Sequence, residues 1–191
     1  MNKPKPLSPT DTSKLLHACA ITTNRHLGDL VEFVLLSGCE RFGAMRLTWR
    51  DVDLRARKIT IEGRTGRYTI PMTVALADVL TRRAERLTRL DLVFWTDHKS
   101  RNGAYPRPYC EHFTPGGELT TCTNSTWTLT DLRATYKAHT RCILPIFAAT
   151  LLGKAQHENI IETCMTGSDL MQAAEAVTKS ILTGGIKHDA A

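Results

Sequence analysis

The chain has 191 residues, of which 42% are hydrophobic, so it is long enough for one domain with an apolar core. Its net charge of +6 favours a polyanionic partner such as nucleic acid, although an ordinary globular surface is often mildly basic too. A transmembrane helix is excluded because no run of about 18 apolar residues exists, and Met1–Pro9 lacks the apolar segment of a secretory signal. We therefore expect a cytoplasmic protein with no membrane partner.

The chain is expected to form one domain without internal repeats. Residues 1–7 are polar and rich in proline, and we expect this lead-in to be disordered. Residues 8–186 alternate periodic apolar segments with turn signals, and residues 187–191 form a short tail.

Three helices are predicted in the first quarter of the chain. The first begins at Ser8, because a serine cap accepts a backbone hydrogen bond and Pro9 tolerates the first helical position. The second covers residues 27–37 and ends at Gly38. The third covers residues 41–49, where apolar side chains recur at helical spacing.

A β-hairpin follows these helices. Residues 58–62 alternate apolar and polar side chains, which predicts a strand with one buried face. Gly63–Gly66 is a turn, and residues 68–72 form the returning strand. Pro71 places that strand at the edge of a sheet, because proline cannot donate a hydrogen bond to a neighbouring strand.

The middle of the chain predicts a long helix, a short strand and a long loop. Residues 74–90 are amphipathic, and one face of this helix is expected to be solvated because it carries Arg82, Arg83, Arg86 and Arg89. A short strand at 92–95 precedes a loop at 99–128, which is rich in Gly, Pro, Thr and Asn.

The remaining helices are predicted at 129–139, 145–152, 158–165 and 168–182. The last has apolar residues at helical spacing, so it packs either on its own core or on a neighbouring subunit. The fold class predicted from all these elements is α+β, mostly helical, with a small antiparallel hairpin or sheet.

Six cysteines occur in the chain, and reduced thiols are the default without a secretory signal. Three residues of the 110–122 loop, namely Cys110, His112 and Cys122, could in principle hold zinc, but their spacing fits no common zinc module. We therefore expect neither a metal nor another cofactor. We interpret three other cysteines as small core residues on helices: Cys19, Cys39 and Cys142.

The stretch Gly38–Asp53 fits a family pattern without a gap: Gly-x-Arg-x-x-Glu-x-x-x-Leu-x-Trp-x-Asp-Val-Asp. Its second half, Leu47–Leu54, is the specific part. Three later blocks resemble the same family: Ile59–Met72 its hairpin, Thr130–Arg133 its His-Asp-Leu-Arg motif, and Leu151–Lys154 its Leu-Leu-Gly-His motif. The chain thus resembles the catalytic domain of tyrosine recombinases, the phage-integrase family. The resemblance implies that fold, here without the family's N-terminal core-binding domain.

The resemblance also implies where the chemistry would lie. In the family, two arginines clamp the scissile phosphate and a hairpin lysine protonates the leaving oxygen. Two histidine-type residues assist, and a tyrosine attacks phosphorus. The corresponding positions here are Glu40 for the first arginine, Arg64 for the lysine, Thr130 and Lys154 for the histidines, and Thr163 for the tyrosine. These positions are degenerate, so no catalytic residue is assigned.

Arg133 matches the second arginine and is the one clamp residue that is kept. Arg41 is adjacent to Glu40, but one step along a helix turns a side chain by about 100°, so it could substitute only if the register shifts. Allowing two inserted residues moves the tyrosine position to Met165, and no tyrosine follows Tyr136, which we interpret as a core aromatic.

Three functions fit these observations. The first is a non-catalytic protein that binds double-stranded DNA, a regulator or architectural factor of a phage or mobile element. The second is a divergent recombinase with unusual catalytic residues. The third is an interaction module that modulates integrase assembly, with a homo-oligomer formed through the C-terminal helix. The residues expected to contact DNA are Arg41, Arg64, Arg67, Arg133 and Lys154.

Overall fold

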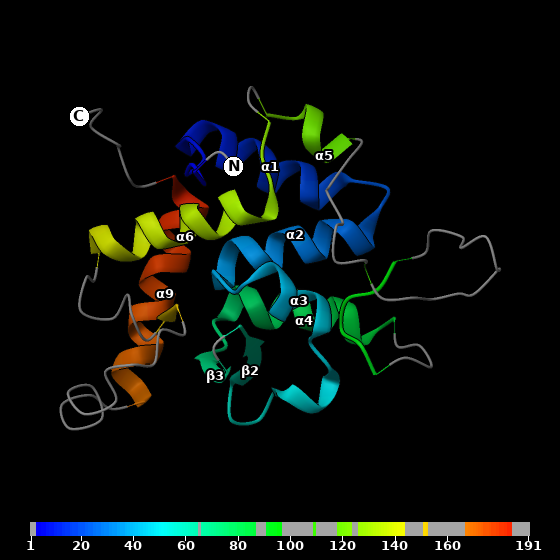
Figure 1. The fold of residues 1–191 in the computed structure, drawn as a ribbon, viewed down its shortest axis with the longest axis vertical. Coiled ribbons are helices and arrows are strands. Elements are labelled where there is room, and N and C mark those ends of the chain that lie inside the picture. Colours follow the sequence, from blue (N-terminus) through cyan, green and yellow to red (C-terminus); the bar gives the residue numbers. More distant parts are fainter. Residues whose placement is uncertain are drawn as a thin grey trace.

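The computed structural model describes residues 3–64, 66–86, 91–96, 109, 118–123, 126–143, 151–152 and 167–184. Within them it has the mostly helical α+β architecture that the sequence predicts (Figure 1). The helices are α1 (Pro9–Ile21), α2 (Arg25–Ser37), α3 (Arg41–Arg46), η1 (Trp49–Asp51), α4 (Val74–Ala84), α5 (Glu118–Thr121), α6 (Leu129–Ile143) and α9 (Gly167–Thr183). The strands are β1 (Val52–Asp53), β2 (Lys58–Gly63) and β3 (Gly66–Pro71). The helices predicted at 145–152 and 158–165 lie outside the described residues, apart from positions 151 and 152.

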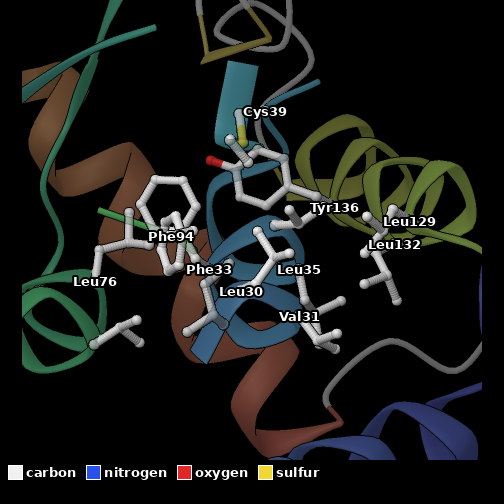
Figure 2. Close-up of a cluster of buried hydrophobic side chains, with 14 of the residues drawn as sticks. Leu30, Val31, Phe33, Leu35, Cys39, Leu76, Phe94, Leu129, Leu132 and Tyr136 are labelled. Carbon is white, nitrogen blue, oxygen red and sulfur yellow. The ribbon is translucent and has the colours of Figure 1, made fainter. Parts of the chain in front are cut away.

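Helix α2 is the centre of the molecule (Figure 1). Five other helices contact it: α1, α3, α4, α6 and α9. Ten of its thirteen residues are buried, as expected of a helix enclosed by others. Its buried apolar side chains include Leu30, Val31, Phe33, Val34, Leu35 and Leu36. Figure 2 shows Leu30, Val31, Phe33 and Leu35 in a cluster that also contains Leu76, Phe94 and Tyr136.

The sheet has the order β1-β2-β3, and both strand pairs are antiparallel. Ile59 and Ile61 are fully buried, as the alternation in this segment predicts. Strand β3 is an edge strand that ends at Pro71, which confirms the interpretation of that proline. Strand β1 is an addition that the sequence did not predict.

The third helix is shorter than predicted, because α3 ends at Arg46 and not at residue 49. Backbone groups beyond it pair with a distant segment: Trp49 N–H donates to the Asp91 carbonyl, and Val93 N–H donates to the Leu47 carbonyl. Those hydrogen bonds take the place of the helical ones, and η1 follows directly.

Helix α4 is also shorter than the predicted range 74–90, since it ends at Ala84. The expectation of a solvated arginine face is wrong for two residues. Arg83 has a side-chain exposure of 0%, and Arg82 pairs with Asp29 and Glu32 of α2. An arginine side chain can be buried when it reaches a buried carboxylate. The helical periodicity of apolar residues gives no sign of such burial.

The region predicted as one loop, residues 99–128, contains α5 in its described part. Leu119 and Trp127 are buried there, and the Trp127 indole donates to the Leu119 carbonyl at 3.1 Å. The cysteine predictions hold only in part. Cys19 is buried on α1, whereas Cys39 is buried in the loop after α2 and Cys142 is exposed on α6.

The possible zinc residues Cys110 and His112 lie outside the described residues. Among the residues that are described, no group of three His, Cys, Asp or Glu side chains could hold a metal ion. In the same part of the chain, no helix combines the length and apolar character that crossing a bilayer requires.

Both ends of the described chain are anchored. The lead-in expected to be disordered makes hydrogen bonds to α6: Lys5 N–H donates to Asp131 Oδ1 at 2.8 Å, and Leu7 N–H donates to Thr135 Oγ1 at 2.9 Å. Leu7 is buried, and its apolar side chain explains why the segment docks. Helix α9 forms as predicted, and of the two packing alternatives the structure shows contacts within the same chain, with α1, α6 and β3.

Candidate nucleic-acid interface

The turn between α2 and α3 is fixed by Gly38 and Tyr136. Gly38 has φ 61° and ψ 13°, a left-handed conformation that favours glycine, and its N–H donates to the Val34 carbonyl. A Cβ at Gly38 would overlap the Tyr136 ring, which lies beside Cys39 (Figure 2). Burial raises the pKa of the Tyr136 phenol, so the residue is a neutral core aromatic, as interpreted from the sequence. The turn leaves Glu40 at the start of α3.

The β2–β3 hairpin brings its turn next to Glu40. Its register pairs Gly63 with Gly66 and leaves Arg64 in the turn, where the Arg64 N–H donates to Glu40 Oε2 at 3.2 Å. Helix α3 approaches β2 closely at Gly43, since a Cβ there would overlap the side chain of a β2 residue. The family pattern has Glu at this position, and that side chain would not fit against the hairpin.

Arg133 reaches the same turn from α6. Its Nη1 donates to the Gly38 carbonyl at 3.0 Å, and its Nη2 donates to the Leu152 carbonyl at 3.1 Å. Nη2 also lies 3.6 Å from Glu40 Oε1. That separation exceeds a hydrogen bond, so the two charges form a loose ion pair, while the guanidinium is oriented by the two carbonyls. Arg133, which the sequence predicts to match the family's second arginine, therefore faces a carboxylate of its own chain.

Tyr68 on β3 belongs to this site, and sequence reasoning missed it. Its ring lies against Gly63, and its hydroxyl is buried beside the Arg133 guanidinium and the Glu40 backbone. Among the described residues, no hydrogen bond of good geometry satisfies that hydroxyl. Burial raises the pKa of Tyr68 to about 12, so the phenol is neutral at pH 7. The sequence carried no signal for this role, because a tyrosine in an alternating strand predicts only a place on the hairpin.

The structure places the side chain of Arg41, the residue next to Glu40, in the wall of a cavity. This cavity has a volume of about 410 Å³, and its other lining residues are Phe42, Met45, Arg46, Glu62, Leu92 and Tyr109. Within the described part of the chain Arg41 makes no ion pair.

Several other arginines on this side are neutralised. Arg67 forms an ion pair with Asp51, and Arg50 Nε lies 2.8 Å from Asp91 Oδ2. Arg64 is exposed, and its side chain makes no ion pair among the described residues. Of the predicted DNA contacts that can be placed, Arg41 and Arg64 are thus the ones whose charge is not balanced by an acidic partner.

The remaining predicted positions are Thr130, Lys154 and Thr163. Thr130 is exposed on the first turn of α6, where the family has a histidine. Lys154 and Thr163, at the second histidine and tyrosine positions, lie outside the described residues. The structure thus brings together Glu40, Arg133 and the turn residue Arg64.

This arrangement is poorly suited to clamping a phosphodiester. Two guanidinium groups would neutralise the phosphate oxygens, whereas one guanidinium and one carboxylate have no net charge. A phosphate placed against Arg133 would also be repelled by Glu40. Arg133 and the Arg64 N–H can face a carboxylate, and in this structure they face that of Glu40.

No family profile matches the sequence, and no curated protein matches it. Solved structures do. The Tn1549 transposon integrase in complex with circular intermediate DNA superposes with a TM-score of 0.63 at 17% identity over 88% of this chain. XerA recombinase gives a TM-score of 0.59 at 19% identity over 90% of this chain. A lambda integrase dimer bound to a core site gives a TM-score of 0.55 at 16% identity over 80% of this chain.

The chain has the fold of a tyrosine-recombinase catalytic domain. It spans 66%, 64% and 59% of those three proteins, which is less than two thirds of each. The fold predicted from the motif blocks is therefore confirmed. The recombinase-like fold also explains why Gly38, Arg64 and Arg133, which are far apart in the sequence, meet at one turn.

Proposed function

We propose that this chain is a non-catalytic DNA-binding protein with a recombinase fold, acting as a regulator or architectural factor of a phage or mobile element. The observation that carries the proposal is the position of Glu40. Glu40 occupies the position of the family's first clamp arginine, and its carboxylate lies 3.6 Å from Arg133, which matches the second. The site therefore lacks the charge that stabilises a transferring phosphoryl group.

Three further observations support DNA as the partner. The neighbours in fold include an integrase in complex with circular intermediate DNA and another bound to a core site. The net charge is +6. Arg41 and Arg64 offer unbalanced positive charge beside the turn, while Arg67, Arg133 and Lys154 complete the proposed contact set. Such a partner also fits the cytoplasmic location expected from the sequence.

The proposal predicts binding without cleavage. The full-length chain, incubated with a pool of random duplexes and with a nicked duplex that traps strand-transfer intermediates, should retard DNA in a native gel. Denaturing electrophoresis of the same samples should reveal neither nicks nor a covalent protein–DNA adduct, because a neutral clamp and no tyrosine nucleophile leave the transition state unsupported.

An active recombinase of the fold should be run in parallel, to show that the nicked duplex traps an adduct when chemistry occurs. A phenol-resistant adduct formed by this chain would overturn the proposal and favour the divergent recombinase. If no duplex is retarded at low salt, DNA is not the partner.

The interaction-module alternative includes a homo-oligomer through α9. A lambda integrase tetramer bound to a Holliday junction shares the fold. Here, however, Ala174, Val177 and Ile181 of α9 are buried within the chain itself. A homo-oligomer formed by this helix would have to use its outer side, where Leu182 is 46% exposed.

A further inference from the structure

Donor groups of the hairpin turn and of α6 approach the Glu40 carboxylate. The Arg64 N–H approaches Oε2 at 3.2 Å, and Arg133 Nη2 approaches Oε1 at 3.6 Å. The Tyr68 hydroxyl is buried beside the Arg133 guanidinium and the Glu40 backbone, and among the described residues it has no partner of good hydrogen-bond geometry. We call Arg64 N–H, Arg133 and Tyr68 the donor cradle. Its members come from the hairpin and α6, so the cradle exists independently of the residue that fills it.

Glu40 is held only loosely in this cradle. Its contact with Arg133 is longer than a charge-assisted hydrogen bond, which is typically about 2.7–2.9 Å. The side chain is 29% exposed, and it makes no hydrogen bond that caps α3. A rotamer change can therefore carry the carboxylate into solvent without moving the backbone.

Arg133, by contrast, is held firmly. Two carbonyls accept from its guanidinium, and its side chain is only 19% exposed. Arg133 therefore stays in place when the Glu40 side chain turns into solvent. The donor cradle would then present the Arg133 guanidinium, the Arg64 N–H and the Tyr68 hydroxyl, each of which can donate a hydrogen bond to an oxyanion.

We propose that Glu40 is a built-in occupant of this cradle, which keeps a DNA phosphate out and can be displaced or neutralised to admit one. The inference rests on the proposed function, because it concerns how the same site meets DNA. It assigns Glu40 an autoinhibitory role: the carboxylate occupies the place of a phosphate and thereby prevents one contact with the DNA backbone. Removing the charge of residue 40 should add that contact.

Two variants with the same change in charge separate this effect from general electrostatics. Glu40→Gln removes the occupant. Glu62→Gln is the control, because Glu62 is 60% exposed on β2 and lies 4.0 Å from Arg46, not from Arg133. Each variant loses one negative charge, so its net charge is one unit more positive than that of the natural chain. Circular dichroism and thermal unfolding establish that both remain folded, and Glu40→Ala is a second way to empty the cradle.

The first readout is the salt dependence of binding to a duplex pool. One additional phosphate contact steepens the slope of log affinity against log salt by about 0.9. That change is expected for Glu40→Gln and Glu40→Ala. Glu62→Gln should raise affinity slightly while leaving the slope close to that of the natural chain.

The second readout does not need DNA. Inorganic phosphate at constant ionic strength should raise the melting temperature of Glu40→Gln, because a ligand that binds only the folded state stabilises it. It should leave Glu62→Gln and the natural chain unchanged. In the double variant Glu40→Gln/Arg133→Gln, the phosphate effect should disappear.

Equal slopes for the Glu40 and Glu62 variants, with no stabilisation by phosphate, would overturn the inference even if DNA binds. Stabilisation of Glu40→Gln alone by phosphate, with no DNA binding by any variant, would support the cradle and overturn the proposed function. The two ideas thus fail in different ways.

Discussion

Arg83 joins α4 to the 91–96 segment and to α2. Its side-chain exposure is 0%, its Nε donates to the Val93 carbonyl at 2.9 Å, and its Nη1 lies 2.6 Å from His26 Nδ1. Asp29 Oδ2 is 3.9 Å away, and the Trp95 ring lies 5.2 Å from the guanidinium carbon. Burial lowers the pKa of Arg83, which reflects the cost of removing a charge from water.

Replacing Arg83 with methionine should lower the free energy of unfolding by about 3 kcal/mol. The Val93 carbonyl and His26 would lose the Arg83 contact, and among the described residues buried Asp29 would keep Arg82 as its paired arginine. Urea unfolding followed by tryptophan fluorescence measures the change.

The control for this prediction is Arg86→Met, since Arg86 is exposed and its replacement should stay within about 0.5 kcal/mol. Equal stability of the two variants would mean that the buried charge gives no net stabilisation over a methionine of similar volume.

At the scale of elements, α9 is tied to α4 by one carboxylate. Glu175 Oε1 accepts from the Val74 N–H at 2.8 Å and from Arg57 Nη2 at 3.3 Å. Val74 is the first residue of α4, so Glu175 satisfies an N–H that has no partner within the helix. A negative charge at this end also interacts favourably with the helix dipole.

Glu175→Gln should therefore destabilise the chain by about 1 kcal/mol or less, because the side chain is 36% exposed and its charge is partly screened. Glu85→Gln offers a matched control at the other end of α4, where loss of a negative charge should be neutral or slightly stabilising. Thermal unfolding of both variants at low ionic strength measures the difference. Identical melting temperatures would mean that the tie is not important for stability.

At the scale of the whole molecule, α9 completes the core. Its buried face includes Ala173, Ala174, Val177 and Ile181, and it contacts α1, α2, α6 and β3. Burial of this apolar face contributes to the same hydrophobic core that α2 organises.

A chain that ends at residue 166 should therefore lose cooperative unfolding and aggregate, because the apolar faces of α6 and α1 become exposed. Circular dichroism melting and sedimentation velocity provide the test, with the full-length chain run at the same concentrations. A truncated chain that melts cooperatively as a monomer would show instead that α9 serves assembly with another subunit.

Local patterns in the sequence determined much of this fold. The Ser8 cap, the glycine after α2 and the alternation around Ile59 depend on neighbours within a few residues, and each produced the predicted element. The ungapped block Gly38–Asp53, followed in order by the three later blocks, indicated the recombinase fold, because each block is a continuous stretch of sequence.

Tertiary structure alone decided the contents of the site. Glu40 meets Arg64 across 24 residues, Arg133 meets Gly38 across 95, and Tyr68 enters beside them from the edge strand. The sequence placed Glu40 and Arg133 at clamp positions, but it could not show that the Glu40 carboxylate would lie against the Arg133 guanidinium. Such contacts depend on how helices and strands far apart in the sequence approach one another, and the pattern within any one segment does not determine that approach.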